Sequence, residues 1–269
     1  MTPRCEPIEA VLAKVRASLL YADWPIPPRV RALSTLRGPS GYSTGPFAHF
    51  NFGSGSGDDP TAIADNRLLL CRGAGLPTAP CWLQQVHGTH VVRFPRQVVR
   101  GERLSVSTAI EADAAVSTVP GIVLAILSAD CLPVLIAADN GREIAAAHAG
   151  WRGLAGGVLE ATLAALDTAP AHLQVWLGPG IGASSYEVGA EVYTALVGPY
   201  PEAAVHFVTT RPGHWACDLV GLARQRLKIA GVTRIFGGDF DTCADPRFYS
   251  YRRDGLCSGR LASLIWMEP

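Results

Sequence analysis

Short apolar runs bounded by glycine, proline or polar residues dominate the chain from residue 80 onward and predict β-strands. Helical periodicity is confined to fewer segments, such as the face formed by Leu154, Val158 and Leu163. The predicted strands are 80–86, 89–94, 111–118, 121–128, 132–139, 143–149, 173–178, 233–236 and 260–266, and the predicted helices are 6–20, 60–73, 154–166, 186–197 and 217–230. Because strands follow one another in neighbouring hairpins more often than they alternate with helices, we expect a mixed α/β (α+β) fold with a mixed sheet.

Prolines 25, 27 and 28 close off the first predicted helix. We therefore expect a loosely attached N-terminal extension over residues 1–29 and a single domain over residues 30–269. Residues 36–57 are rich in glycine, serine and proline and predict a long loop. A loop of that length inside a compact domain is typical of a functional site.

The segment 121–138 is apolar and long enough to cross a bilayer. However, Asp130 and Pro133 lie in its middle, and β-branched residues occur in both halves. These features favour two buried strands around an Asp-Cys-Leu-Pro turn over a membrane helix. Asn140-Gly141 then predicts a hairpin turn into 143–149. We expect no association with a membrane.

Composition narrows the function classes. The chain has 269 residues, 48% of them hydrophobic, with 23 basic and 23 acidic side chains. Proteins that neutralise many phosphates of a polymer are usually basic, so the zero net charge argues against nucleic-acid binding.

The seven cysteines are odd in number and contain no CxxC pair, which favours a reducing, cytoplasmic compartment over a disulfide framework. Glu9, Lys14 and Arg16 interrupt the first apolar stretch, so we expect no signal peptide.

Three residues that can bind metal occur at predicted strand ends: His87, Cys131 and His148. Two histidines and one cysteine suit Zn²⁺, and three protein ligands leave a fourth position open. The separations of 44 and 17 residues match no zinc finger, so the residue types alone leave three interpretations open. The first is a zinc site, the second is a core cysteine with two hydrogen-bonded histidines, and the third is a Cys-His nucleophile pair.

Two further motifs are compatible with anion binding. The glycine-serine run 53–57 resembles a phosphate cradle, but no Gly-Lys-Ser/Thr follows it, so a flexible loop is the better interpretation. Residues 249–255 combine aromatic side chains with Arg252 and Arg253, which suits either an anion site or an ordinary salt-bridged hairpin. Arg37, within the long loop, has the same ambiguity.

Six sequence blocks, in this order, resemble the YfiH-like proteins, also called the multicopper polyphenol oxidoreductase (laccase) domain family and now regarded as purine nucleoside phosphorylases. The resemblance extends from about residue 30 to the C-terminus. The blocks are Trp82–Gly88, Glu111–Ala115, Ser128–Val134, His148–Gly153, Trp176–Gly182 with Tyr186–Gly189, and Phe248–Asp254 with Gly259-Arg260.

The resemblance implies a largely antiparallel, sandwich-like β-core with helices outside it, shared with cysteine-hydrolase-like domains. It also implies that His87, Cys131 and His148 bind zinc rather than copper. The implied reaction is phosphorolysis of a purine nucleoside (adenosine, inosine, guanosine or methylthioadenosine), with adenosine deamination as a second activity. The expected partners are therefore purine nucleosides and phosphate, and we expect a monomer or a small homo-oligomer.

Roles for individual residues are assigned from their chemistry and their positions beside the metal-binding residues. Asp130 and Cys131 are the candidate catalytic residues, with Asp130 acting as an acid/base or as an anchor for a zinc-bound histidine. The candidate substrate-binding residues are Arg37, Asn51, Arg152 and Arg252. Arg152 is the first choice for phosphate because it lies four residues from His148 and an arginine can bind phosphate in a bidentate manner.

Three rival functions remain. A copper-dependent phenol oxidase needs many more histidines, including His-x-His pairs, whereas this chain has seven histidines and no such pair. A metal-free hydrolase would use Cys131 and His148 directly. A non-catalytic adaptor with a structural zinc would need a fourth ligand, and the sequence offers no obvious one.

Overall fold

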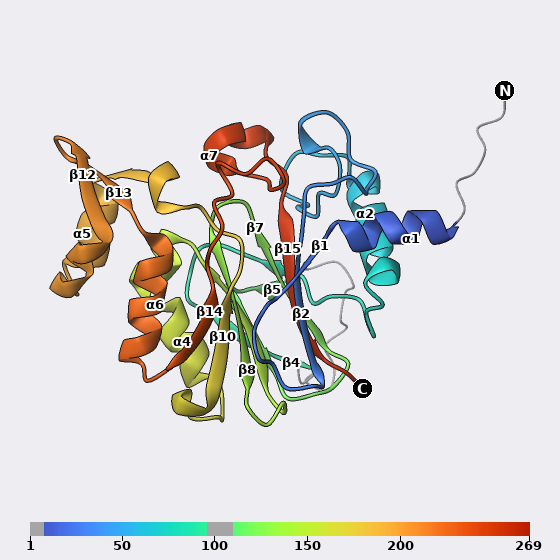
Figure 1. Cartoon of the computed structure of the whole chain (residues 1–269), viewed down its shortest axis with the longest axis horizontal. Helices are drawn as coiled ribbons and strands as arrows, with labels where there is room; N and C mark the ends of the chain where they lie inside the picture. Colours follow the sequence, from blue (N-terminus) through green and yellow to red (C-terminus); the bar gives the residue numbers. More distant parts are fainter. Residues whose placement is uncertain (1–7, 96–109) are drawn as a thin grey trace.

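Two β-sheets lie face to face at the centre of the structure, a computed structural model that describes residues 8–95 and 110–269 (Figure 1). The first sheet is antiparallel throughout. Its strands, in spatial order, are β1 (Leu19–Tyr21), β2 (Val30–Thr35), β15 (Leu261–Met267) and β7 (Val123–Ser128).

The second sheet is antiparallel at its centre and parallel at both edges. Its strands, in spatial order, are β14 (Arg234–Gly237), β10 (Leu173–Leu177), β8 (Leu132–Ala138), β9 (Ile144–Ala149), β6 (Ala114–Ser117) and β4 (Val91–Phe94). Smaller sheets join β11 (Glu187–Gly189), β13 (His214–Cys217) and β12 (Phe207–Arg211), and β3 (Leu83–Gln84) with β5 (Ile110–Glu111). The predicted mixed, largely antiparallel core is confirmed.

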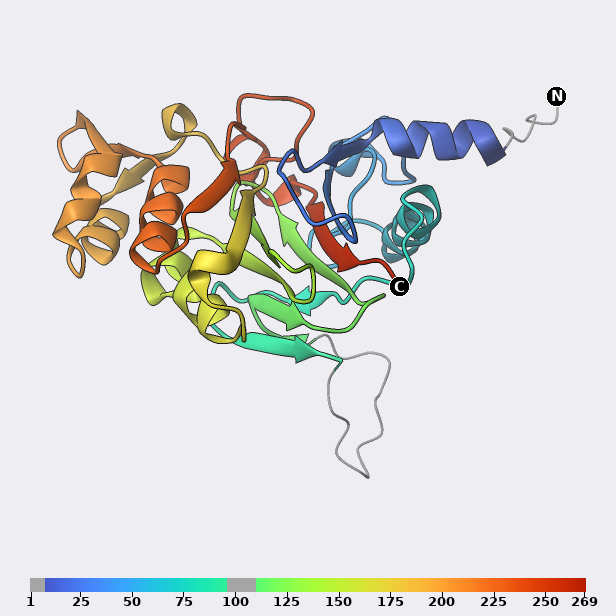
Figure 2. The ribbon, with the colours of Figure 1, turned by 60° about the horizontal axis from the view of Figure 1, so that its bottom comes forward.

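Helices cover both outer faces of the sandwich, as predicted. Figures 1 and 2 show α1 and α2 on one side and α4, α5 and α6 on the other. The helices are α1 (Ile8–Ala17), α2 (Pro60–Gly73), α3 (Trp151–Gly156), α4 (Val158–Ala164), α5 (Ala190–Val197), α6 (Leu219–Ile229) and α7 (Tyr251–Asp254). Short 3-10 helices lie at Gly45–Phe47, Pro170–His172, Ala183–Ser185, Pro201–His206 and Gly255–Cys257. None of the helices in the described ranges has the length and hydrophobicity that a membrane crossing requires.

The apolar segment 121–138 forms two buried strands, β7 and β8, as predicted. These strands do not form a hairpin, because β7 belongs to the first sheet and β8 to the second. The turn between them therefore crosses from one sheet to the other, and Asp130 adopts a left-handed backbone with a φ of 85°. The predicted hairpin turn at Asn140-Gly141 is confirmed, with Gly141 at a φ of 64° between β8 and β9.

Several predicted boundaries were wrong. The helix expected over 154–166 is broken at Gly157, whose φ of 94° ends α3 and begins α4. The helix expected over 186–197 begins only at Ala190, because 187–189 pair as β11. Strands β1, β2, β12 and β13 were not predicted, and the helix expected over 6–20 ends at Ala17.

The N-terminal segment packs onto the first sheet rather than lying loosely beside it. Strand β1 pairs with β2, and Val15 of α1 is fully buried against Gly73 of α2. The expected loose attachment is therefore wrong for residues 8–21. The division of the chain after residue 29 stays a prediction.

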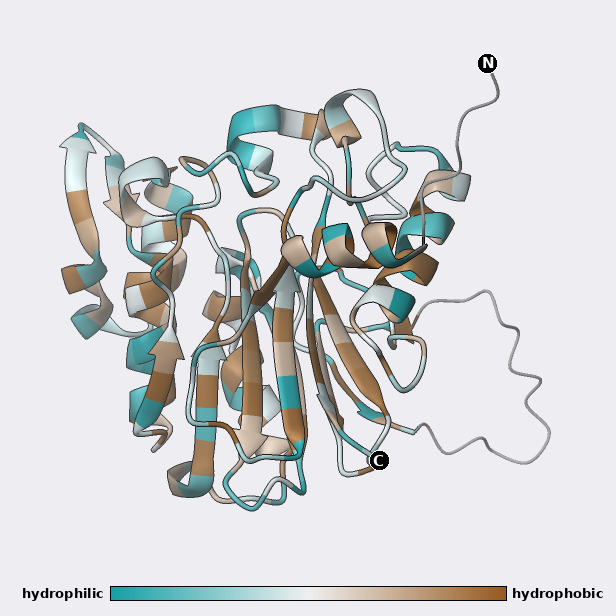
Figure 3. Ribbon diagram, turned by 45° about the vertical axis from the view of Figure 1, so that its right-hand side comes forward, coloured by the Kyte–Doolittle hydropathy of each residue, from teal (hydrophilic) through white to brown (hydrophobic). Residues whose placement is uncertain are grey.

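The space between the sheets is filled by side chains that alternate along the strands, with a period of two. Leu124 and Ile126 of β7, Leu135 of β8 and Ile144 and Ala146 of β9 all belong to this inner core. Figure 3 shows these strands as mostly hydrophobic along their length.

Continuing the same alternation to one end of the sandwich places polar side chains on the inner faces. These residues are Ser128 at the end of β7, Cys131 just before β8 and His148 near the end of β9. The core of the sandwich therefore changes from apolar to polar at this end, where the functional residues gather.

Candidate metal centre

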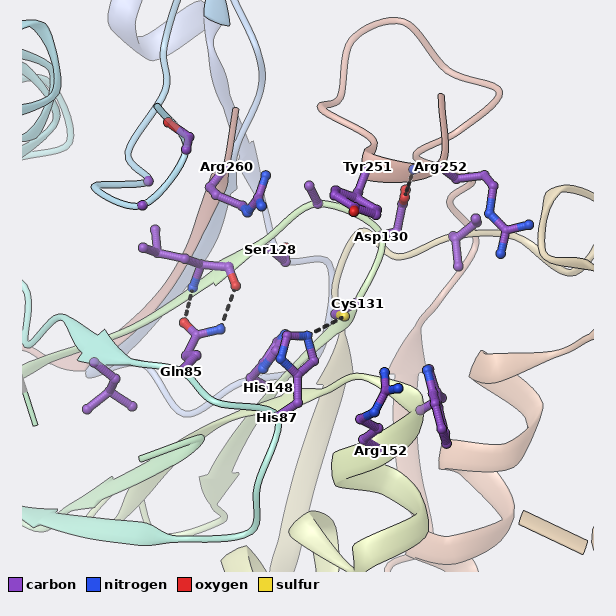
Figure 4. Close-up of a pocket in the computed structure, with 18 of the residues that line it drawn as sticks. Gln85, His87, Ser128, Asp130, Cys131, His148, Arg152, Tyr251, Arg252 and Arg260 are labelled. Atoms are coloured by element: carbon purple, nitrogen blue, oxygen red, sulfur yellow. Dashed lines mark hydrogen bonds between the residues drawn. The ribbon is translucent and has the colours of Figure 1, made fainter. Parts of the chain in front are cut away.

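The three predicted metal ligands converge at the polar end of the sandwich. The donor atoms of His87, Cys131 and His148 all lie within 4.8 Å of one another. Figure 4 shows their side chains pointing toward a common point, from the loop after β3, the turn before β8 and the end of β9. Their convergence is confirmed, while the binding of a metal stays a prediction.

The geometry of this cluster suits a metal bound by nitrogen and sulfur. The Cys131 Sγ lies 3.7 Å from the His87 Nε2, and the two imidazole rings meet edge to face with centroids 4.8 Å apart. Gly150 makes this approach possible, because a Cβ at that position would lie 2.8 Å from the Cys131 Sγ and 3.0 Å from the His87 Cδ2. Two imidazoles and a thiolate are a donor set that Zn²⁺ accepts with one position left open.

Asp113 holds both histidines in place. The Nδ1 of His148 donates to the Asp113 Oδ1 at 2.9 Å, so the Nε2 is the nitrogen left for a metal. The same carboxylate accepts from the backbone N–H groups of Val86, His87 and Gly88, at 3.2, 2.9 and 2.6 Å. One fully buried carboxylate thus fixes the ring of His148 and the loop that carries His87.

Sequence reasoning missed the role of Asp113, although the block Glu111–Ala115 was recognised. The signal was its position, because Asp113 comes directly before β6 and its alternation partner Ala115 faces the inner core. A carboxylate on an inner face is costly unless it is hydrogen-bonded, so such a residue marks a built network.

The charges in the cluster support one another. Burial alone would raise the pKa of the Cys131 thiol, but the adjacent His148 charge, with hydrogen bonds from both histidines, lowers it below its usual range. Burial alone would lower the pKa of His148, but the Cys131 thiolate and then Asp113 raise it. Hydrogen bonds from His148 and from backbone amides likewise outweigh burial and lower the pKa of Asp113.

A pocket of about 1010 Å³ opens over the metal-ligand cluster. His87, Cys131 and His148 form part of its wall, and other polar residues complete it (Figure 4). These include Ser128, Asp130, Tyr186, Arg152, Arg252 and Arg260. The pocket therefore combines a candidate metal centre with several cationic side chains.

Asp130 lines this pocket at the end of the β7 strand, as expected, but it is not an anchor for a histidine. Its Oδ1 accepts from the Thr242 hydroxyl and its Oδ2 from the backbone N–H of Arg252, both at 2.6 Å. Asp130 thus ties the turn that carries Cys131 to the C-terminal segment around α7. The anchor role belongs to Asp113.

Two of the predicted substrate-binding arginines reach the pocket. Arg152 lines the pocket, and its side chain is more than half exposed. Its guanidinium carbon lies 4.2 Å from the centroid of the Trp151 ring, and its Nη2 lies 3.5 Å from a Glu191 carboxylate oxygen. The guanidinium carbon of Arg252 lies 5.3 Å from the centroid of the Tyr186 ring. The Nη1 of Arg252 donates to the backbone carbonyl of Glu187.

The other two predicted substrate-binding residues do not line the pocket. Arg37 donates to the carbonyls of Pro46 and Ala48, within its own loop, so its guanidinium serves as a brace there. Asn51 is fully buried, and it holds the following loop by donating to Ser56 and accepting from the Gly53 N–H. Substrate contact by Arg37 or Asn51 stays a prediction.

Two pocket residues were missed by the assignment of roles from sequence. Gln85 exchanges two hydrogen bonds with the backbone of Leu127, at 2.8 and 2.7 Å, and so ties the His87 loop to β7 (Figure 4). Arg260, the residue directly before β15, also lines the pocket. Both residues lie within recognised sequence blocks, which were the available signal.

Comparison with known proteins identifies the family of this chain. A profile described as multi-copper polyphenol oxidoreductase laccase matches residues 31–268. The chain is 52% identical to the purine nucleoside phosphorylase of Xylella fastidiosa (strain 9a5c) over 255 residues, which are 93% of this chain and 96% of that protein. It is 42% identical to the purine nucleoside phosphorylase YfiH of Escherichia coli (strain K12) over 252 residues, which are 93% of this chain and 99% of that protein.

Solved structures show the same fold. The crystal structure of a Neisseria meningitidis protein has a TM-score of 0.87 at 42% identity and covers 94% of this chain and 100% of its own. YlmD from Geobacillus stearothermophilus has a TM-score of 0.83 at 31% identity and covers 91% and 94%. The chain therefore belongs to the multi-copper polyphenol oxidoreductase laccase family, the YfiH-like proteins.

Proposed function

We propose that this protein is a zinc-dependent purine nucleoside phosphorylase. The observation that carries this proposal is one pocket in which a two-histidine, one-cysteine cluster faces cationic side chains. Relatives that align over nearly their whole length are named purine nucleoside phosphorylases, which supports the same activity. The proposed substrates are adenosine, inosine, guanosine or methylthioadenosine together with phosphate. Cytoplasmic location and a monomeric or small homo-oligomeric state stay predictions.

Within this proposal, His87, Cys131 and His148 hold the metal, and Asp113 keeps the Nε2 of His148 directed at it. A bound zinc would supply a Lewis acid with one open coordination position. Asp130 keeps the turn of Cys131 against the C-terminal segment, so we assign it a positioning role beside its place in the pocket wall.

Phosphorolysis also requires that the phosphate is oriented and that developing charge is stabilised. The reaction requires phosphate to be held against C1′ of the sugar while positive charge develops on the ring. Guanidinium groups bind the oxygens of phosphate in pairs, and the pocket presents them from Arg152, Arg252 and Arg260. Adenosine deamination is proposed as a side activity of the same metal centre.

A metal-free Cys/His hydrolase is the second candidate, and one observation favours it. The Cys131 thiol lies beside two imidazoles that lower its pKa, as a nucleophilic thiolate requires. A copper-dependent phenol oxidase has less support, because multicopper chemistry needs further ligand sets. Within residues 8–95 and 110–269, His87, Cys131 and His148 form the one cluster of three or more metal-binding side chains.

One experiment separates these functions. Purified protein is assayed for bound zinc and copper by elemental analysis, then stripped with a chelator and reloaded with either metal. Each form is incubated with the nucleoside panel with and without phosphate, and bases and sugars are resolved by chromatography. We expect phosphate-dependent release of base and a sugar 1-phosphate that needs zinc. Undiminished release of base and free sugar after chelation, without any need for phosphate, would instead support the hydrolase. A gain of phenol oxidation with copper would support the oxidase.

A further inference from the structure

Ser128 has a buried hydroxyl with no hydrogen-bond partner in the described chain. The residue is 2% exposed, and it lies at the end of β7, on the inner face that also leads to the metal-ligand cluster. It lines the pocket, three residues before Cys131. Buried hydroxyls are nearly always paired, so an unpaired one in a pocket wall indicates a partner that arrives with the ligand.

Arg260 supplies a cation to the same pocket. Strand β15 pairs with β7 so that Leu261 lies opposite Ser128, which places Arg260 beside the end of β7 (Figure 4). Its Nη1 donates to the carbonyls of Ser258 and Gly259, at 2.7 and 2.9 Å. Among the described residues, its Nε and Nη2 have no hydrogen-bond partner and no carboxylate pairs with it. Burial lowers the pKa of this guanidinium, and the negative charges of Cys131 and Asp130 oppose that effect only in part.

A glycine-serine loop lies against the same arginine. Gly53 packs so closely on Arg260 that a Cβ would lie 2.5 Å from the arginine Cγ. Asn51 holds both partners, because its Oδ1 accepts from the Gly53 N–H at 3.0 Å and from the Arg260 N–H at 2.7 Å. The residues from Gly53 to Ser56 line the pocket. The sequence motif set aside as a flexible loop therefore borders the site.

We propose that Ser128, Arg260 and the loop from Gly53 to Ser56 form an oxyanion subsite that binds phosphate beside the metal centre. The hydroxyl of Ser128 donates to one phosphate oxygen, and the Nε and Nη2 of Arg260 donate to two others. The assignment of inorganic phosphate as the ligand rests on the proposed phosphorylase activity.

The other two arginines of the pocket are less suited to this task. Arg152 is mostly exposed, stacks on Trp151 and has the Glu191 carboxylate nearby. Arg252 is exposed to solvent, lies over the Tyr186 ring and donates to the Glu187 carbonyl. Arg260, in contrast, is mostly buried, and no carboxylate of the described chain lies in ion-pair contact with it, so an anion gains most by binding there.

In the reaction, the bound hydrogen phosphate forms a bond from one oxygen to C1′ of the nucleoside. The C1′–N9 bond breaks and its electron pair leaves with the purine. The proton that the phosphate carried ends on a purine nitrogen. The products are the free base and the sugar 1-phosphate, and no oxidant or reductant is needed.

The test is direct binding of inorganic phosphate, measured by calorimetry and by the rise in Tm at constant ionic strength, on zinc-loaded protein and again after chelation. Ser128→Ala is expected to weaken phosphate binding about tenfold, since a hydrogen bond to a charged ligand is lost. It should keep its fold, because no protein partner of the hydroxyl is removed. Arg260→Lys, which keeps the charge but loses the paired geometry, should weaken binding at least as much.

The matched control is Ser40→Ala. Ser40 also has a buried hydroxyl without a partner in the described chain, but it lies outside the pocket. We expect its phosphate affinity to equal that of the unchanged protein. Arg152→Gln tests the rival assignment, and a loss of phosphate binding in that variant with none in Ser128→Ala and Arg260→Lys would overturn the subsite.

Activity assays separate this proposal from the proposed function. We expect Ser128→Ala to raise the KM for phosphate about tenfold and to change the KM for the nucleoside little. An unchanged phosphate KM in an active enzyme refutes the subsite alone. Phosphate binding that depends on Ser128 and Arg260, in a protein without phosphorolysis, refutes the proposed function alone. Adenosine 5′-monophosphate provides the second arm, because tighter binding of it than of phosphate would reassign the subsite to a nucleotide.

Discussion

The imidazole of His148 and the carboxylate of Asp113 form a buried pair, joined at 2.9 Å between Nδ1 and Oδ1. The backbone N–H of His148 also donates to the Asp113 carbonyl, so the two residues are linked through both side chain and main chain. This double link leaves little freedom to the ring. It presents the His148 Nε2 to the cluster.

Replacing Asp113 by asparagine should therefore weaken zinc binding. Loss of a carboxylate that orients a ligating histidine typically lowers metal affinity about 10- to 100-fold. The measurement is competition with a chromophoric chelator, with circular dichroism to verify the fold. Glu111→Gln is the matched control, because Glu111 is exposed and lies outside the pocket wall. Equal zinc affinity in Asp113→Asn and the unchanged protein would remove Asp113 from the metal centre.

Cys131→Ala should abolish nucleoside turnover and remove most of the bound zinc. A ligand set reduced from three to two loses most of its affinity, so metal content and rate should fall together. The matched control is Cys257→Ala, which changes an exposed cysteine outside the pocket. Metal content is measured by elemental analysis, and turnover by chromatography of the released base. Full activity in Cys131→Ala would contradict the zinc-enzyme proposal.

Much of the fold follows from local patterns, because buried strands show themselves as short apolar runs. The pairing partners do not follow, since pairing depends on contacts between residues far apart in the chain. The segment 121–138 illustrates both points. Its two strands and the turn at Asp130 were predicted, but their division between two sheets depends on the pairing of β7 with β15.

The candidate site divides in the same way. His87, Cys131 and His148 were found as metal-binding residue types at predicted strand ends, and the family resemblance then favoured zinc. Their separations in the chain gave no evidence that they meet. Asp113 was missed because an aspartate in a strand is indistinguishable from a surface carboxylate until its inner-face position is known. The place of Arg260 in the pocket depends on the pairing of β15 with β7, in which Leu261 lies opposite Ser128. No local sequence pattern contains that register.

Gly150→Ala should lower metal affinity at least tenfold and leave the fold intact. The φ of Gly150 is −71°, which alanine adopts freely, so the backbone is not strained. The added Cβ would lie 2.8 Å from the Cys131 Sγ and must push the thiol or the His87 ring out of place. Gly189→Ala is the control, because a Cβ there meets nothing within 4 Å. Chelator competition and thermal unfolding measure the two effects, and unchanged metal affinity in Gly150→Ala would contradict the inferred geometry.

In the metal-free protein, Cys131 should react with iodoacetamide already near neutral pH. The thiolate is the reactive form, and the neighbouring His148 and His87 lower the pKa of this thiol to about 6 despite its burial. Its reactivity should therefore be nearly full at pH 7 and decline as the pH falls through 6.

Burial instead raises the pKa of Cys81 to about 11 and that of Cys217 to about 12, so these thiols should stay unreacted. Peptide mass spectrometry follows each cysteine separately over pH 5 to 9. Zinc loading should protect Cys131, because the sulfur is then bound to metal. A Cys131 that reacts only above pH 8, or equally with and without zinc, would show that the histidines and the metal do not act on this sulfur.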